Sequence, residues 1–388
     1  GTVTVTQSGG TTFSSTVDTG TSVVLTDTTG TIQFDGALTT PTLTTAAAGY
    51  NVSLLGGSTI TNAVTFSNTG TTQIGDATAD TNTFTGGLTA TAGAVTASGT
   101  IGTTNQDLSL GVVTLVEAQA LTLDTANTGG GNIALSSITG VSGGSSEDVT
   151  LESGTGTIAV SGAIGTDIGT LSLQENDGGA TGAVTLSGAV TADTLTTFAQ
   201  GYGVSLLGGG TITTDTTFLN TGAITIGDGT GDTTTFTGGL DMTAGGSENL
   251  AGTIIATNQQ IDVGAANVSA DATIDGGSGA INLGAMTLSD GVTLTVGTGG
   301  SGAPTITSVS GTASGTASNL TLNTTGTASV GAVGTDLGTV TVTQSGGTTF
   351  SSTVDAATVA ITDTADSQAV TFSDNLTLTS GLTVSNGG

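Results

Sequence analysis

A long internal repeat restricts the possible folds more than any other property of the chain. Residues 50–88 and 202–240 align without a gap, and 27 of their 39 positions are identical. A second repeat joins GTVTVTQSGGTTFSSTVD at residues 1–18 to an identical stretch at 338–355. Self-similarity over such lengths is typical of repeat proteins, in which each unit packs against its neighbours. We therefore expect a series of similar units packed one against the next.

The repeats divide the chain into modules. The stretch GAIGTDIG at 162–169 matches GAVGTDLG at 331–338, a shift of 169 positions. Two complete repeat modules and the start of a third follow from this shift. We expect them over residues 1–168, 169–337 and 338–388, all within one continuous solenoid.

A shorter period lies inside each module. The blocks that begin at Tyr50 and Tyr202 are offset by only 152 positions, so the second module lacks 17 positions before its block and regains them after it. Phe66 and Phe84 are 18 positions apart, and the equivalent phenylalanines of the second block have the same spacing. These two observations predict a structural unit of about 17–18 residues, with Phe66 stacked above Phe84.

Short alternating runs dominate the local pattern. Val52-Ser53-Leu54 and Thr59-Ile60-Thr61 are separated by Gly56-Gly57. β-Branched and aromatic residues favour strands, and glycine supports the tight turns between them. No stretch has a helical period. The pattern predicts an all-β fold, a parallel β-solenoid with one coil per period, and the alternative is a set of tandem β-sandwich repeats.

The charge balance excludes several classes of partner. The 388 residues include 29 acidic residues and no Lys, Arg, His or Cys, so the formal net charge is −29. Without basic side chains the chain cannot neutralise phosphates, which argues against nucleic acid and anionic lipid as partners. No apolar run reaches the length of about 18 residues that a spanning helix needs. We expect an exported, soluble protein without membrane insertion.

Catalysis is not expected. The residue types that usually act as bases and nucleophiles are missing, and only carboxyl and hydroxyl groups remain. Glu147, Asp148 and Glu152 are the candidates for a carboxylate pair of the kind that hydrolyses glycosides. A solvated acidic turn explains these three residues more simply. We therefore predict that the protein is not an enzyme and has no catalytic residues.

Two acidic loops are candidates for a calcium site. Asp76 and Asp80 lie four residues apart in a loop that begins with glycine, and Asp228 and Asp232 repeat the arrangement. Carboxylate and carbonyl oxygens are the ligands that Ca²⁺ prefers, so these four residues are the metal ligands we predict. The alternative, which we favour, is that the aspartates cap their turns through the local backbone. No other cofactor is expected.

Two further motifs have local interpretations. Asp167 and Asp336, in GTDIG and GTDLG, are predicted to be turn residues. The Thr-x-Thr runs at 2–6 and 339–343 are of a kind that binds ice when threonines form a flat regular face. The simpler explanation is that Thr suits the outward side of a strand, and Ser, Asn, Gln and Asp interrupt these runs.

The stretch GAVGTDLGTVTVTQSGGTTF resembles the large β-strand-repeat surface proteins of bacteria, which are broadly similar to filamentous-haemagglutinin-like and autotransporter-type adhesins. The likeness extends over the whole chain and is one of repeat style and composition. The absence of Lys and Arg departs from the usual composition of that family. It implies a parallel β-helical stalk that is secreted to the cell exterior or cell surface, with a role in adhesion, matrix or fibre formation.

Two functional hypotheses follow. The first is a structural extracellular protein whose partner is itself, through association of its repeats, with the cell surface or a polysaccharide as further partners. The second is a surface-binding module that recognises polysaccharide or ice through a flat Thr-rich face.

Overall fold

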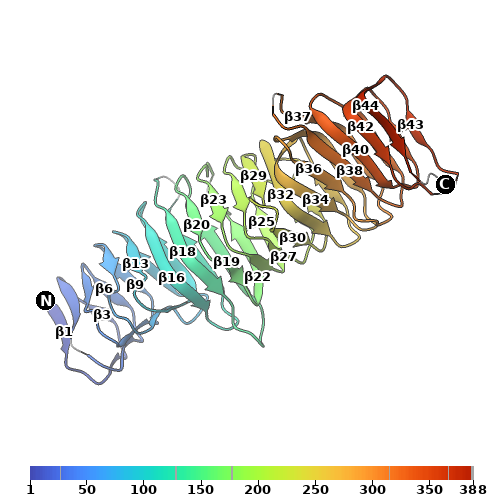
Figure 1. Ribbon diagram of the computed structural model, residues 1–388. Helices are drawn as coiled ribbons and strands as arrows, with labels where there is room; N and C mark the ends of the chain where they lie inside the picture. Colours follow the sequence, from blue (N-terminus) through green and yellow to red (C-terminus); the bar gives the residue numbers. More distant parts are fainter. Residues whose placement is uncertain (27, 127–128, 176–177, 314, 366, 386–388) are drawn as a thin grey trace. The chain divides into compact units, whose positions relative to one another are not determined.

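The computed structural model describes residues 1–26, 28–126, 129–175, 178–313, 315–365 and 367–385. The chain forms two compact units, Gly1–Gly203 and Val204–Gly388. All regular structure in the described residues is β-strand, and none of these residues lies in a helix. Within each unit the strands are stacked side by side (Figure 1).

The described residues of the N-terminal unit form 25 strands, most of them two to five residues long. The first 13 are β1 (Thr2–Thr6), β2 (Thr11–Phe13), β3 (Val17–Asp18), β4 (Ser22–Thr26), β5 (Thr31–Phe34), β6 (Leu38–Thr40), β7 (Leu43–Thr45), β8 (Asn51–Leu54), β9 (Ser58–Ile60), β10 (Val64–Thr65), β11 (Thr72–Ile74), β12 (Thr81–Phe84) and β13 (Leu88–Ala90). The others are β14 (Val95–Ala97), β15 (Gly99–Thr103), β16 (Leu108–Leu115), β17 (Leu121–Asp124), β18 (Ile133–Thr139), β19 (Glu147–Glu152), β20 (Ile158–Val160), β21 (Ile164–Gly165), β22 (Ile168–Leu173), β23 (Val184–Leu186), β24 (Val190–Ala192) and β25 (Thr194–Thr197).

The C-terminal unit contains longer strands, several of which have eight to ten residues. The first ten are β26 (Val204–Leu206), β27 (Gly210–Ile212), β28 (Thr216–Thr217), β29 (Ala223–Ile226), β30 (Thr233–Phe236), β31 (Leu240–Asp241), β32 (Ser247–Ala256), β33 (Ile261–Val263), β34 (Ala266–Asp275) and β35 (Ile281–Leu288). The others are β36 (Thr293–Val296), β37 (Pro304–Gly311), β38 (Ser318–Asn323), β39 (Ala328–Val333), β40 (Leu337–Gln344), β41 (Thr348–Phe350), β42 (Val354–Ile361), β43 (Val370–Phe372) and β44 (Leu376–Val384).

Parallel pairing joins each coil to the next, which confirms the predicted β-solenoid over the alternative of β-sandwich repeats. Most coils are longer than the predicted period. Val95 lies opposite Val113, 18 positions further on, whereas Ile138 lies opposite Ile164, 26 positions further on. Several other coils have intermediate lengths, and one is longer, since Leu121 lies opposite Val149, 28 positions further on. Because the strands stay in register while the turns between them vary, one sequence period does not describe the array.

The predicted stack of Phe66 above Phe84 is not formed. Phe84 pairs with Ile60 of the preceding coil, and the Phe66 and Phe84 rings meet edge to face in the core, with centroids 6.3 Å apart and planes at 77°. The 18 positions between these two phenylalanines are therefore less than one full coil, and the two rings occupy different positions around it. True ring stacks occur at longer spacings: Phe13 lies on Phe34 with centroids 4.8 Å apart and planes at 8°.

The segment before the repeated stretch 202–240 is one coil shorter than the segment before the matching stretch 50–88. Val3 is followed by Val23 and then by Leu43 in successive coils. In the second module Leu171 is followed directly by Leu195. One coil is therefore missing, and the coil that remains is longer than either of the two it corresponds to. The 17 positions that the second module lacks before its block therefore correspond to one whole coil.

Columns of apolar side chains fill the interior. In one column Phe34, Leu54, Ile74 and Ala97 follow one another in four successive coils, and each is fully buried. The outward residues between them are mostly Thr, Ser and Gln. Alternation along each strand thus separates a dry core from a polar surface, and burial of the columns supplies the main stabilising free energy of the coil.

A buried tyrosine begins each of the two long repeated stretches, residues 50–88 and 202–240, and its hydroxyl joins two coils. The Tyr50 hydroxyl donates to the carbonyl of Leu25 at 3.2 Å and accepts from the N–H of Ala46 at 3.0 Å. The Tyr202 hydroxyl makes the equivalent pair of bonds at 2.8 and 2.7 Å. Burial raises the pKa of Tyr50, and it raises the pKa of Tyr202 to about 12. Each hydroxyl therefore stays protonated and joins two coils over the whole physiological pH range.

Tyr50→Phe should lower the free energy of unfolding by roughly 0.5–1.5 kcal/mol, because it removes the hydroxyl's hydrogen bonds to two coils while the N–H of Ala46 keeps its 3.0 Å bond to the carbonyl of Leu25. The same loss is expected for Tyr202→Phe. Urea unfolding followed by far-UV circular dichroism measures the change. A midpoint equal to that of the unmodified protein in both variants would contradict the assigned role of the two hydroxyls.

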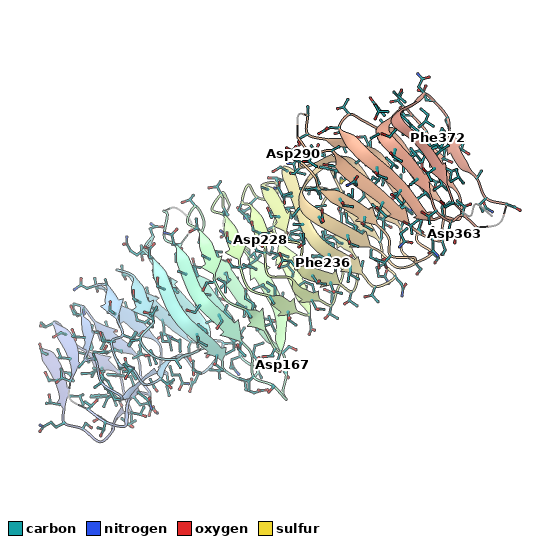
Figure 2. The ribbon with its side chains drawn as sticks, viewed as in Figure 1. Asp167, Asp228, Phe236, Asp290, Asp363 and Phe372 are labelled. Carbon is teal, nitrogen blue, oxygen red and sulfur yellow. The ribbon has the colours of Figure 1, made fainter. Side chains whose placement is uncertain are left out.

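The two GTD turns have the predicted character. Asp167 and Asp336 both adopt left-handed backbone conformations, with φ of 56° and 64°. Their carbonyls accept from the N–H groups of Glu147 and Ser318 in the preceding coil. Asp167 lies at the rim of the coil stack (Figure 2). These aspartates therefore turn the chain and carry the backbone pairing from coil to coil.

Candidate functional site

The first acidic loop is organised by its own aspartate. Oδ2 of Asp80 accepts from the N–H groups of Asp76 at 2.8 Å and Ala77 at 2.9 Å. Gly75 precedes the loop with φ of 77°, and a Cβ there would lie 2.3 Å from the carbonyl oxygen of Ser98. Glycine is therefore required at the corner, and Asp80 holds the turn that follows it.

The second acidic loop repeats this geometry. Oδ2 of Asp232 accepts from the N–H groups of Asp228 and Gly229, both at 2.9 Å. Gly227 has φ of 75° and lies against the carbonyl oxygen of Ala251. One carboxylate oxygen of each predicted ligand pair is thus engaged by the backbone, as the turn-capping alternative expected.

Asp76 shows how the two carboxyl groups of a loop influence each other. Its pKa is raised, first by burial and then by a hydrogen bond to Asp80 and the negative charge of that group. Within the described residues, no three or more Asp or Glu side chains are arranged so that they could hold one metal ion. The assignment of Asp76, Asp80, Asp228 and Asp232 to Ca²⁺ stays a prediction.

The calcium prediction has a direct test. Ca²⁺ at millimolar concentration should raise the thermal midpoint of the protein, since a ligand that binds only the folded state stabilises it by mass action. The double variant Asp76→Asn, Asp228→Asn keeps both capping aspartates and should lose that gain. If chelation and calcium addition leave the midpoint unchanged in the unmodified protein, the two loops are turn caps only.

The acidic residues considered for catalysis all lie on β19: Glu147, Asp148 and Glu152. Glu147 is buried, and its two carboxylate oxygens accept from the N–H groups of Ala118 and Val141, each at 3.1 Å. Asp148 faces solvent and accepts from the N–H of Thr170 at 2.7 Å. Consecutive strand residues point to opposite sides, so Glu147 and Asp148 do not form a facing carboxylate pair.

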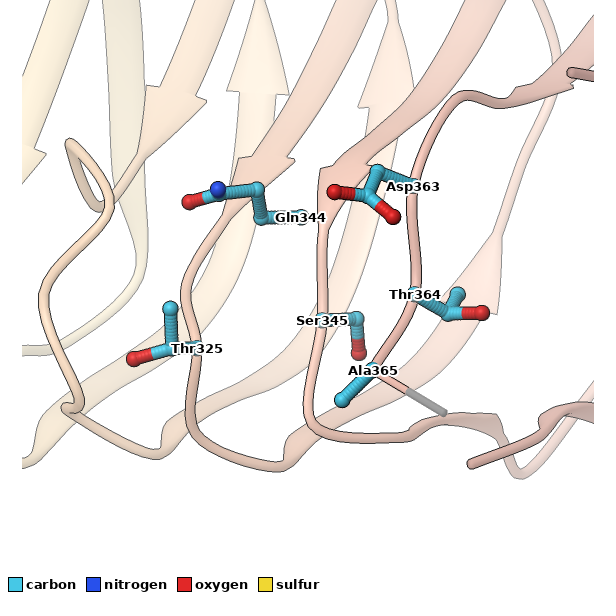
Figure 3. Close-up of a pocket in the computed structure, with 6 residues that line it drawn as sticks. All are labelled: Thr325, Gln344, Ser345, Asp363, Thr364 and Ala365. Atoms are coloured by element: carbon cyan, nitrogen blue, oxygen red, sulfur yellow. The ribbon is translucent and has the colours of Figure 1, made fainter. Parts of the chain in front are cut away.

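The first cavity is a shallow polar recess between three successive loops (Figure 3). It has a volume of about 280 Å³ and is lined by Thr325, Gln344, Ser345, Asp363, Thr364 and Ala365. The Ser345 hydroxyl already bonds to the Thr348 hydroxyl at 2.7 Å and accepts from the N–H of Gly347. The Thr325 hydroxyl likewise donates to the carbonyl of Gly300 at 3.1 Å, so these two hydroxyls of the lining serve local turns.

A second cavity of about 280 Å³ contains three aspartates, Asp215, Asp241 and Asp262. The Asp262 carboxylate accepts from the side-chain amides of Gln260 and Asn282, each at 2.7 Å. Asp241 and Asp262 lie opposite each other on adjacent strands. The amides thus satisfy the carboxylate of Asp262, and the carboxylate of Asp241 accepts from the N–H and the hydroxyl of Thr243 at 2.9 and 2.7 Å.

Glu248 is a site that sequence reasoning missed. It occupies a core column between Ile224 and Ala266, and it is 2 % exposed. Oε2 accepts from the N–H of Gly264 at 2.9 Å. Burial, opposed by this bond and assisted by the charge of Asp241, raises the pKa of Glu248 to about 7. A carboxyl group in an apolar column makes this coil sensitive to pH.

A row of threonines is the most regular surface feature. Six successive coils of the C-terminal unit place Thr at the same strand position, in register, and we call these residues the threonine row: Thr233, Thr253, Thr273, Thr295, Thr321 and Thr341. Their spacings in the sequence are unequal, so no fixed period reveals them. The row ends at Thr341, which lies opposite Ala360 of the next coil.

A scan against protein-family models finds no match, and searches of curated proteins and of solved structures likewise give no match. In the described part of the chain there is no helix long and apolar enough to cross a membrane.

Proposed function

We propose that this chain is a structural, non-enzymatic protein: a β-solenoid subunit or stalk of a secreted bacterial fibre, matrix or surface adhesin that associates with itself through its repeats. The observation that carries the proposal is the unbroken parallel pairing of coils in each unit, over a core filled by apolar columns. Such a coil stack transmits load along hydrogen bonds and presents the same surface many times.

The resemblance to the β-strand-repeat surface proteins supports the same role. The solenoid architecture agrees with that resemblance in texture, and the composition fits an exposed protein because it contains no Lys or Arg at which trypsin could cleave. The partners we propose are further copies of the chain, with the cell surface or a polysaccharide beyond them. Nucleic acid is not proposed, since no basic group is present.

Self-association of this chain must overcome its own charge. With a formal charge of −29 and no cationic side chain, two copies repel each other until ions screen them. We therefore expect assemblies to be absent at low ionic strength and to grow as NaCl is raised through about 0.15 M, where the screening length is about 8 Å.

Sedimentation velocity and negative-stain electron microscopy of the purified chain test the proposal. Leu54→Asp, in a fully buried column, should abolish both the coil stack and assembly, whereas Thr59→Asp on the outward side should preserve the fold. A chain that remains monomeric at every salt and protein concentration would contradict self-association.

A further inference from the structure

The threonine row carries hydroxyl groups that the protein itself does not use. Within the described residues, none of its six hydroxyls makes a hydrogen bond to another protein group. Thr233 is exposed and the other five are half-buried. Each hydroxyl therefore has one donor and two acceptor positions that no protein group occupies, beside a methyl group.

The backbone fixes the positions of these hydroxyls. In-register strands lie about 4.8 Å apart, and β-branched side chains have few rotamers. On β36 and β38 a second outward pair, Thr293 and Asn319, runs beside the row, and on β40 a register shift interrupts it, where Oδ1 of Asn319 accepts from the N–H of Thr339 at 2.9 Å. Residues two apart on a strand are separated by roughly 6.6 Å. The threonine row is thus a regular line of hydrogen-bonding groups, widened to two positions on β36 and β38, that is ordered before it meets a ligand.

A regular row of this kind matches a partner that is itself periodic. A dissolved small molecule uses one or two positions, whereas a crystal surface engages every position at once. Strands β36, β38 and β40 carry no charged and no aromatic residue. Stacking of sugar rings on an aromatic platform is therefore not offered, and a second copy of this chain would bring only like charge.

We propose that the threonine row binds the surface of ice, with its hydroxyls joining the water lattice and its methyl groups resting between lattice positions. The proposal identifies a binding face on the C-terminal unit and does not depend on self-association. Part of the required order is already present, because the hydroxyls hold fixed spacings and the first water layer has only to adopt the same repeat.

The test uses the full chain and a single ice crystal in buffered water. The unmodified protein should shape the crystal and separate its freezing and melting temperatures. Thr321→Tyr, at the centre of the three uncharged strands, should abolish this separation, because one large ring holds the whole face away from a solid surface. Thr287→Tyr is the matched control, since Thr287 is equally half-buried and outward but lies on β35 in a mixed row with Asn267 and Ser310.

A milder variant guards against loss of the fold. The triple variant Thr295→Val, Thr321→Val, Thr341→Val keeps the shape and β-branching of the row and removes three hydroxyls, so it should fold normally by circular dichroism and retain only part of the separation. The proposal is overturned if the unmodified protein leaves ice unaltered, or if Thr321→Tyr or the triple variant is as active as the control. Binding to crystalline cellulose or chitin that Thr321→Tyr abolishes, without activity on ice, would overturn it in favour of a polysaccharide face.

Discussion

Phe34→Ala is expected to lower the free energy of unfolding by about 3–5 kcal/mol. The ring is fully buried, stacks on Phe13 with centroids 4.8 Å apart, and lies opposite Leu54 of the next coil. Removing it leaves a cavity bordered by three successive coils. The parallel strands on both sides are held by the same register, so the coil cannot collapse to fill the space.

Phe13→Ala is the matched control, because it removes the other ring of the same stack from a half-buried position. Its effect should be about 1–2 kcal/mol, from partial burial and the lost ring contact. Urea unfolding followed by far-UV circular dichroism gives both midpoints. Equal losses in the two variants would show that the stack, and not the buried column, determines the stability of this coil.

Glu248→Gln is expected to stabilise the protein at pH 8 by about 3 kcal/mol. In the folded state the pKa of Glu248 is raised from 4.5 to about 7, chiefly by burial. Above pH 7 the folded protein must hold a buried charge that the unfolded chain hydrates freely, and a tenfold change in proton affinity corresponds to about 1.4 kcal/mol. Glutamine keeps an oxygen that can accept from the N–H of Gly264 without the charge.

The sign of the pH dependence follows from the direction in which the pKa of Glu248 moves on folding. Below about pH 4.5 the carboxyl group is protonated in both states, so the unmodified protein and Glu248→Gln should have similar stability. Between about pH 4.5 and 7 the unfolded chain releases the proton first, and the unmodified protein loses stability. Urea midpoints at pH 4, 6 and 8 should diverge steadily. A constant difference at the three pH values would contradict the assignment.

Glu147→Gln provides a contrast with the opposite sign. Glu147 is as buried as Glu248, but its carboxylate accepts from two backbone N–H groups, those of Ala118 and Val141. Glutamine would direct an N–H₂ group at one of these donors, so stability should fall at pH 8 by roughly 1–3 kcal/mol. The two buried glutamates thus differ in the number of backbone N–H groups that donate to their carboxylates, two at Glu147 and one at Glu248.

Local chemistry in the sequence predicted the turns correctly. Gly75 and Gly227 need a positive φ, and Asp80 and Asp232 were expected to cap their turns through the backbone, as they do. The coil length was predicted wrongly because the spacing from Phe66 to Phe84 separates two corners of the core, not two coils. The sequence spacing between two identical residues does not show whether they occupy equivalent positions in successive coils or different positions around the coil.

The order of the amino acids was enough to establish that the chain is an array of short strands, that no disulfide or internal ion pair holds it, and that its surface is acidic. Alternation and glycine corners are local properties, so they can be recognised without a fold. Which residues become neighbours from coil to coil depends instead on the three-dimensional path of the chain. Variable turns bring residues 20, 22 or 26 positions apart into register, and this register aligns the threonine row and places Glu248 in an apolar column.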